Sequence, residues 1–147
     1  MALKIIFMGT PEFAVPVLKS IQKSNHKILE VYTQPAKRKD RGQKIINSPV
    51  YKCAEQYNLN IRCPISLESE EELDHFKSLK PDLAIVVAYG KILPTKLLNQ
   101  EKILFINLHA SLLPKWRGAA PIQRAIMNME KETGVTIMKI VEKLDAG

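Results

Sequence analysis

Two polar side chains capable of electrostatic and acid–base chemistry lie close together near the end of this 147-residue sequence. Asn107 and His109 follow the continuously apolar run 103–106, which predicts a buried strand. Because side chains alternate between the two faces of a strand, Asn107 and His109 project from the same side. Ligands of open α/β sheets bind at the carboxyl ends of the strands, so we expect chemistry at this position.

The segment after this strand is basic and aromatic. Trp116 lies between Lys115 and Arg117, a combination that can stack on a ring and hold phosphate groups. An equally good interpretation is that Trp116 anchors the loop on the following helix. Ser111 lacks the Gly-x-Ser-x-Gly surroundings of an activated nucleophile, so we do not assign it that role.

A second basic segment occupies residues 34–44. It has no apolar periodicity, so we expect a solvated, mobile loop. The formal net charge of +7 indicates an anionic partner, and a phosphate backbone is one candidate. A solvated run of charge without a ligand is the alternative. The basic side chains of the loop are Lys37, Arg38, Lys39, Arg41 and Lys44, and Arg41, which precedes Gly42, is the strongest candidate for a contact.

Short β-rich runs alternate with longer amphipathic stretches, as βαβ units require. Strands are predicted over residues 4–8, 28–32, 60–63, 82–88, 103–109 and 135–141, and helices over 11–24, 49–57, 69–78 and 119–129. The pattern predicts an α/β fold with a Rossmann-like, open, mainly parallel sheet and helices on both faces.

Several classes of protein are disfavoured. The composition is that of a soluble globular domain, and no apolar run approaches the ~20 residues that cross a bilayer. Cys53 and Cys63 have no metal-ligand spacing, so we expect free thiols in a reducing cytoplasm. Gly9 stands alone after the first strand, which excludes the three-glycine fingerprint of a nicotinamide-binding turn. His26 and His75 are expected at the surface.

Motifs along the whole chain resemble those of the methionyl-tRNA formyltransferases. The chain opens with Phe-Met-Gly-Thr-Pro-Glu-Phe-Ala at 7–14, and Thr-Gln-Pro, Ser-Pro-Val, Val-Val-Ala-Tyr-Gly and Ile-Leu-Pro follow in order. Several formyltransferases share Asn-x-His and Ser-Leu-Leu-Pro, but the continuation Trp-Arg-Gly-Ala-Ala-Pro-Ile-Gln at 116–123 is similar to the tRNA enzymes in particular. Glu-Thr-Gly-Val-Thr-Ile-Met at 132–138 and Leu-Asp-Ala-Gly at 144–147 complete the resemblance.

The resemblance implies transfer of a formyl group from 10-formyltetrahydrofolate to the amino group of methionyl initiator tRNA, without a metal or a covalent enzyme intermediate. It implies that Asn107 and protonated His109 donate to the formyl oxygen and that Asp145 supports His109. It places the donor near residues 83–89 and 111–114, with Val87, Tyr89, Ser111, Leu112, Leu113 and Pro114 as candidate contacts. It also assigns tRNA binding to the basic loop, with Arg41 at the key arginine position, in a monomeric protein of the cytoplasm.

The chain departs from the family pattern in its loop and in its length. Asp40 replaces a usual glycine, and Lys37-Arg38 changes the start of the loop, so we expect a stiffer or more weakly binding loop. The end at Gly147 is expected to make residues 1–147 a truncated N-terminal formyltransferase catalytic domain, without the C-terminal β-barrel that binds tRNA. Two other functions stay open: a sister formyltransferase with a small nucleotide acceptor, and a non-catalytic RNA-binding module that uses the basic loop.

Overall fold

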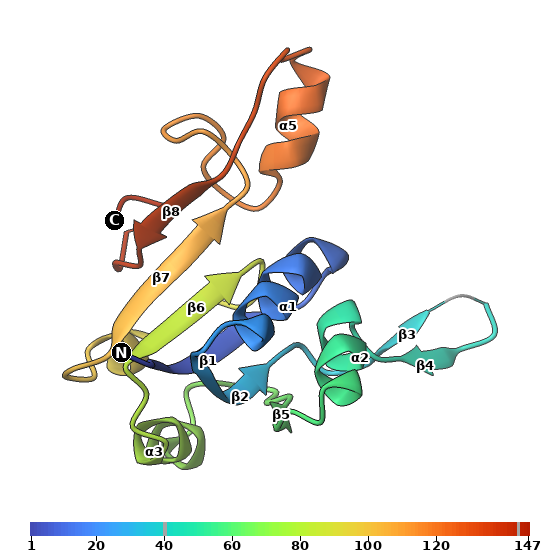
Figure 1. Cartoon of the computed structure of the whole chain (residues 1–147). Coiled ribbons are helices and arrows are strands. Elements are labelled where there is room, and N and C mark those ends of the chain that lie inside the picture. Colours follow the sequence, from blue (N-terminus) through green and yellow to red (C-terminus); the bar gives the residue numbers. More distant parts are fainter. Residues whose placement is uncertain (40, 144) are drawn as a thin grey trace.

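A computed structural model describes residues 1–39, 41–143 and 145–147, and it contains a six-stranded sheet in the order β5-β2-β1-β6-β7-β8 (Figure 1). Adjacent strands are parallel except β7 and β8, which are antiparallel. The mainly parallel α/β architecture is therefore confirmed, and all six predicted strands are present. Their bounds are Lys4–Gly9 for β1, Lys27–Tyr32 for β2, Ile61–Arg62 for β5, Leu83–Val87 for β6, Leu104–His109 for β7 and Thr136–Lys139 for β8.

Helices cover both faces of the sheet. On one face, α1 (Val15–Lys23) and α2 (Pro49–Gln56) pack on alternate residues of the central strands, including the fully buried Phe7 and Val87. On the other face, α3 (Glu70–Ser78) and α4 (Thr95–Leu98) cover a core that contains Phe76 and Phe105. The last helix, α5 (Pro121–Met127), lies beyond the carboxyl end of β7 (Figure 1).

Local signals explain where most helices begin. The Ser48 and Ser69 hydroxyls accept hydrogen bonds from main-chain N–H groups in the first turns of α2 and α3. The helix predicted from residue 11 begins differently, with a 3-10 turn over Glu12–Ala14 and an α-helix from Val15. Pro16 explains the later start, because proline fits the first turn of an α-helix but cannot donate from inside it. The short helix α4 was not predicted.

The basic segment was expected to be a solvated, mobile loop; its basic side chains are exposed, but the segment contains two paired strands. Its strands β3 (Lys37–Lys39) and β4 (Lys44–Ile46) pair antiparallel and form a hairpin that projects away from the main sheet (Figure 1). A two-stranded ladder satisfies its own backbone groups without apolar periodicity, and Gln43 adopts a left-handed φ of 54° near the turn. Asp40, on which the expectation of a stiffer loop rested, lies outside the described residues.

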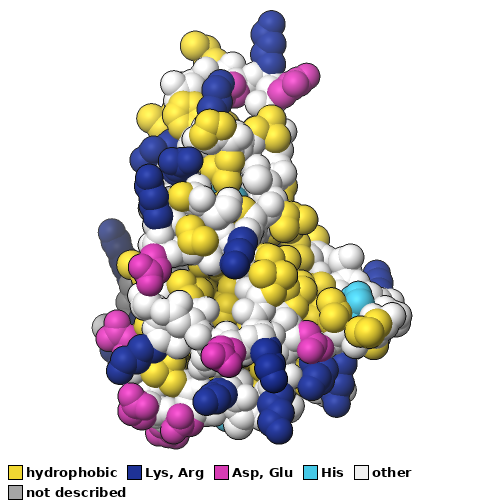
Figure 2. Space-filling view, turned by 90° about the vertical axis from the view of Figure 1, so that its left-hand side faces the viewer, with side chains coloured by type: hydrophobic (Ala, Val, Ile, Leu, Met, Phe, Trp, Pro, Cys, Tyr) yellow, Lys and Arg dark blue, Asp and Glu magenta, His cyan; other side chains and the backbone are white. Residues whose placement is uncertain are grey.

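The surface is mixed in character. On the face shown in Figure 2, exposed apolar side chains collect in the middle, with Lys and Arg side chains around them. Within the described residues, none of the helices has both the length and the apolar character to cross a membrane. The thiols of Cys53 and Cys63 are free, and burial raises the pKa of both.

Candidate functional site

Strand β7 brings Asn107 and His109 to the edge of the sheet where the parallel strands end. Asn107 pairs with Val86 on β6 and with Met138 on β8, and His109 pairs with Thr136 on β8. Both project from the face of the sheet that also carries Phe105, as the alternation of strand side chains requires. Asn107 is half-buried and His109 is buried.

The imidazole of His109 lies between two protein oxygens. Its Nε2 atom is 2.9 Å from the main-chain oxygen of Trp116, and its Nδ1 atom is 3.8 Å from Oδ1 of Asp145. The other carboxylate oxygen of Asp145 accepts a 2.7 Å hydrogen bond from the N–H of Gly118. Both side chains are only 7% exposed, so the carboxylate acts on the imidazole with little screening by water.

Both ring nitrogens of His109 therefore face an oxygen that can accept a hydrogen bond, the main-chain carbonyl of Trp116 on one side and the carboxylate of Asp145 on the other. The amide of Asn107 has no side-chain hydrogen bond among the described residues, so it is the group with spare donors beside the imidazole. The structure thus brings Asn107, His109 and Asp145 into one place although Asp145 lies far along the chain.

Four short hydrogen bonds fix the loop of residues 111–118 that follows β7. The hydroxyl of Thr136 donates to the oxygen of Ser111 at 2.7 Å and accepts from the N–H of Leu113 at 3.1 Å. The hydroxyl of Ser111 donates to the oxygen of Lys115 at 2.6 Å, and Asp145 holds Gly118. Trp116 adopts a left-handed φ of 60°, and its carbonyl faces His109 as a result of this path.

Two cavities flank this loop. One, of about 440 Å³, is lined by apolar groups that include Leu113, Pro114 and Met138, together with the charged groups of Arg117 and Asp145. The other cavity, of about 600 Å³, lies on the Trp116 side of the loop. Volumes of this size accommodate small organic ligands. Asp145 therefore lies both beside the buried imidazole and in the wall of this cavity.

The six predicted donor contacts occupy different environments. Leu113 and Pro114 line the cavity beside Asp145, and Pro114 also lines the second cavity with Leu112. Ser111 is buried and bonded to its own loop, while Val87 and Tyr89 are buried in the two cores on either side of the sheet. Contact between these residues and the donor stays a prediction, and Val87, Tyr89 and Ser111 line neither of the two cavities.

The basic hairpin starts at the edge of the sheet where the parallel strands end, which is also the edge of the candidate site. It leaves the carboxyl end of β2, three strands away from β7 and therefore roughly 14 Å from it at the level of the sheet. The side chain of Gln34 donates to the oxygen of Tyr89 at 3.0 Å, and the hydroxyl of Thr10 donates to the same oxygen at 2.7 Å. Gly90 has a left-handed φ of 85°, which favours glycine, and a Cβ there would also displace the side chain of Gln34 from this junction.

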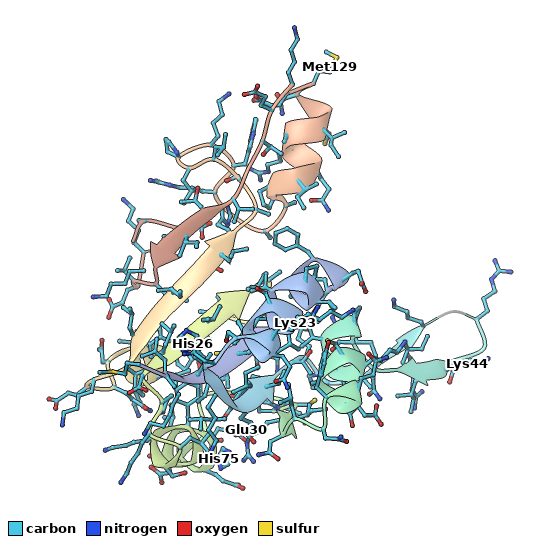
Figure 3. All side chains as sticks on the ribbon, viewed as in Figure 1. Lys23, His26, Glu30, Lys44, His75 and Met129 are labelled. Carbon is cyan, nitrogen blue, oxygen red and sulfur yellow. The ribbon has the colours of Figure 1, made fainter. Side chains whose placement is uncertain are left out.

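All five predicted phosphate contacts lie on this hairpin with exposed side chains: Lys37, Arg38, Lys39, Arg41 and Lys44. One of them, Arg38, donates to the side chain of Gln43 at 3.3 Å. Figure 3 shows that Lys44 lies far from the body of the molecule. The hairpin is thus a basic projection from the same edge of the sheet as the candidate site, three strands away from it, and its contact with tRNA stays a prediction.

A polar cluster under α3 was missed by sequence reasoning. His75 lies 2.6 Å from the buried Glu30 (Figure 3). Arg62 pairs with Glu72 at 2.8 Å. His75 was expected at the surface and is in fact half-buried, because α3 turns its ring toward β2. No local sequence pattern predicts the contact between Glu30 and His75, because the two residues lie 45 positions apart in the chain.

Over the described ranges no group of His, Cys, Asp and Glu side chains has the geometry of a metal site.

The fold and the site define the class of protein. Residues 3–147 match the family model described as formyl transferase, and the chain belongs to that family. Among curated proteins it is 61% identical, over 148 aligned positions, to methionyl-tRNA formyltransferase of Pelagibacter ubique and 52% identical to that of Coxiella burnetii. These alignments cover all of this chain but only 48% and 47% of those relatives, so the chain spans about half their length.

Solved structures agree on the fold. Phosphoribosylglycinamide formyltransferase from Streptococcus pneumoniae TIGR4 superposes with a TM-score of 0.74 at 20% identity, covering 100% of this chain and 78% of that one. A sugar N-formyltransferase from a Shewanella species gives 0.67 at 20% identity, covering 99% of this chain and 54% of that one. The resemblance to the formyltransferases is thus confirmed at the level of family.

Proposed function

We propose that this chain carries the formyl-transfer centre of a methionyl-tRNA formyltransferase. The donor would be 10-formyltetrahydrofolate and the acceptor the amino group of methionyl initiator tRNA. The observation that carries the proposal is the buried His109–Asp145 pair beside Asn107, at the carboxyl end of β7 and next to a cavity. High identity to relatives named for this activity supports the choice of acceptor.

The chemistry follows from the groups present. The uncharged amine attacks the formyl carbon, a C–N bond forms, and negative charge develops on the formyl oxygen. Asn107 donates to that oxygen through its free amide, and His109 contributes the positive charge of its ring. Each donor in comparable oxyanion sites is worth about 3–4 kcal/mol. When the intermediate collapses, the bond to N10 of the folate breaks, N10 takes a proton, and the amine loses one.

His109 must change partner to donate directly. Its Nε2 atom faces the oxygen of Trp116 in the described structure, so the formyl oxygen has to take the place of that carbonyl. The carboxylate of Asp145 lies 3.8 Å from the other ring nitrogen and orients the ring in this proposal. We therefore assign oxyanion stabilisation to Asn107 and His109, and support of His109 to Asp145. Positioning of the two substrates supplies further rate enhancement.

The basic hairpin supplies the contact to tRNA in this proposal. Its five exposed cations, on a projection from the same edge of the sheet, are suited to the phosphate backbone and would make binding strongly dependent on salt. An acceptor as small as glycinamide ribonucleotide needs no such projection. The proposal places the protein in the cytoplasm, where charged tRNA is used, and treats it as a monomer.

The test is formyl transfer by the complete gene product to three acceptors offered separately: methionyl initiator tRNA, glycinamide ribonucleotide and an amino-sugar nucleotide. We expect transfer to the charged tRNA alone, and a loss on the order of 100- to 1000-fold in kcat for Asn107→Ala and for His109→Ala. Lys23→Ala, a change of a basic residue in the last turn of α1, is the matched control and should retain full activity.

Other outcomes of this experiment would assign the protein a different function. Transfer to a small acceptor would keep the mechanism and overturn the choice of tRNA. Binding of tRNA without transfer to any acceptor, unaffected by His109→Ala but lost in Arg41→Ala, would establish an RNA-binding module and refute the catalytic proposal.

A further inference from the structure

The second cavity beside the 111–118 loop has the character of a site for a flat, uncharged ring. It measures about 600 Å³, and its walls include Trp116, Leu112 and Pro114. Trp116 is half-buried, so part of its indole is accessible from the cavity. Nucleobases stack on such aromatic surfaces whatever their sequence, because every base has a π-face.

The charges around this cavity cancel. Lys115 and Lys131 line it together with Glu130 and Glu132, and Lys115 is already paired with Glu130 at 2.9 Å. Two cations balanced by two carboxylates make a poor phosphate site, in contrast to the hairpin. The carboxylates can instead accept hydrogen bonds from an exocyclic amine or from ribose hydroxyls. The cavity therefore favours a nucleoside over a free anion.

The position of the cavity relates it to the proposed chemistry. Trp116 lines this cavity, and its main-chain oxygen lies 2.9 Å from Nε2 of His109. The other cavity is lined by Asp145, whose carboxylate lies 3.8 Å from Nδ1 of the same ring. A reaction that joins two substrates needs two adjoining sites, and each of these cavities is lined by a residue that lies against the imidazole.

The tryptophan is also held in place. Hydrogen bonds fix the main chain on both sides of it, through Lys115 to Ser111 and through Gly118 to Asp145. A ring on a restrained backbone loses little freedom when a base stacks on it, which favours binding.

We propose that this cavity binds the terminal adenosine of the acceptor tRNA, with its base stacked on Trp116. The inference rests on the proposed function and adds the place where the acceptor end is held. The esterified methionine then extends along the loop toward His109 and Asn107, and the donor occupies the cavity beside Asp145. Stacking of the pterin ring on Trp116 is the competing arrangement.

The fluorescence of Trp116 tests this assignment without an activity measurement. The described chain contains one tryptophan, and the difference between wild type and Trp116→Phe isolates its emission in the complete gene product. We expect a saturable change on titration with AMP and no specific change with 5-formyltetrahydrofolate or inorganic phosphate. A saturable response to the folate but not to AMP, or an equal response to inorganic phosphate, would overturn the assignment.

Kinetics provide the second readout. Trp116→Ala should raise KM for methionyl-tRNA on the order of 10- to 100-fold and leave KM for the donor unchanged. Trp116→Phe keeps an aromatic ring and should retain most of the affinity, which separates stacking from misfolding. An unchanged KM for tRNA in Trp116→Ala would refute the inference.

The two proposals fail in different ways. Transfer to tRNA without a Trp116 response to AMP would refute the adenosine site and leave the proposed function intact. A response to AMP in a protein that transfers no formyl group would refute the function and leave the nucleoside site.

Discussion

Thr136 gives the most direct test of how the candidate site is held together. Its hydroxyl joins the oxygen of Ser111 and the N–H of Leu113, so it links β8 to the start of the loop that flanks both cavities. Thr136→Val keeps the shape of the side chain and removes the hydroxyl. One main-chain donor and one acceptor, both part-buried, then lose their partner.

The expected magnitude follows from these two groups. An unsatisfied buried polar group costs about 1–3 kcal/mol, and the lower end applies here because the site is only part-buried. The free energy of unfolding should fall by roughly 2 kcal/mol. For a protein of this size that corresponds to a decrease of roughly 4–8 °C in Tm.

Urea denaturation followed by circular dichroism measures this change, and Thr136→Ser is the matched control because it keeps the hydroxyl. Hydrogen exchange at the amide of Leu113 should accelerate in Thr136→Val and stay slow in Thr136→Ser. Equal stability of the valine variant and wild type, or equal loss in both variants, would refute the idea that this hydroxyl holds the loop.

Three further predictions concern the hairpin and the core. Arg41→Ala should weaken tRNA binding and reduce the slope of log K against log salt by about 1, whereas the same slope in variant and wild type would exclude a phosphate contact. Gly9→Ala should lower the free energy of unfolding by about 1–3 kcal/mol, because a Cβ there would lie 2.9 Å from both Ala14 Cβ and the oxygen of Val87. Its control is Gly42→Ala, which meets nothing within 4 Å and should be neutral in the same urea titration. Tyr32→Phe should leave stability unchanged or raise it by up to about 1 kcal/mol, because its buried hydroxyl has no hydrogen-bond partner within the described residues; a clear loss of stability would show that the hydroxyl is satisfied.

Much of the framework could be predicted from the sequence because its signals are local. Continuous apolar runs marked β6 and β7, and the alternation of side chains along a strand placed Asn107 and His109 on one face. Ser69 and the acidic residues after it marked the start of α3 through a bond made within one turn. Such patterns depend on neighbours along the chain, so they can be recognised without tertiary structure.

The arrangement of the site depended on contacts between distant residues. Asp145 lies beside His109 only because β8 turns back antiparallel along β7, and Trp116 turns its carbonyl to the imidazole only because its φ is left-handed. The basic segment gave no apolar period, and its hairpin arises from backbone pairing that most side chains permit. The sequence by itself determined the strands and the polar pair at the end of β7. Tertiary structure alone decided which carboxylate, carbonyl and cavities surround that pair, because packing between segments far apart in the chain sets those distances.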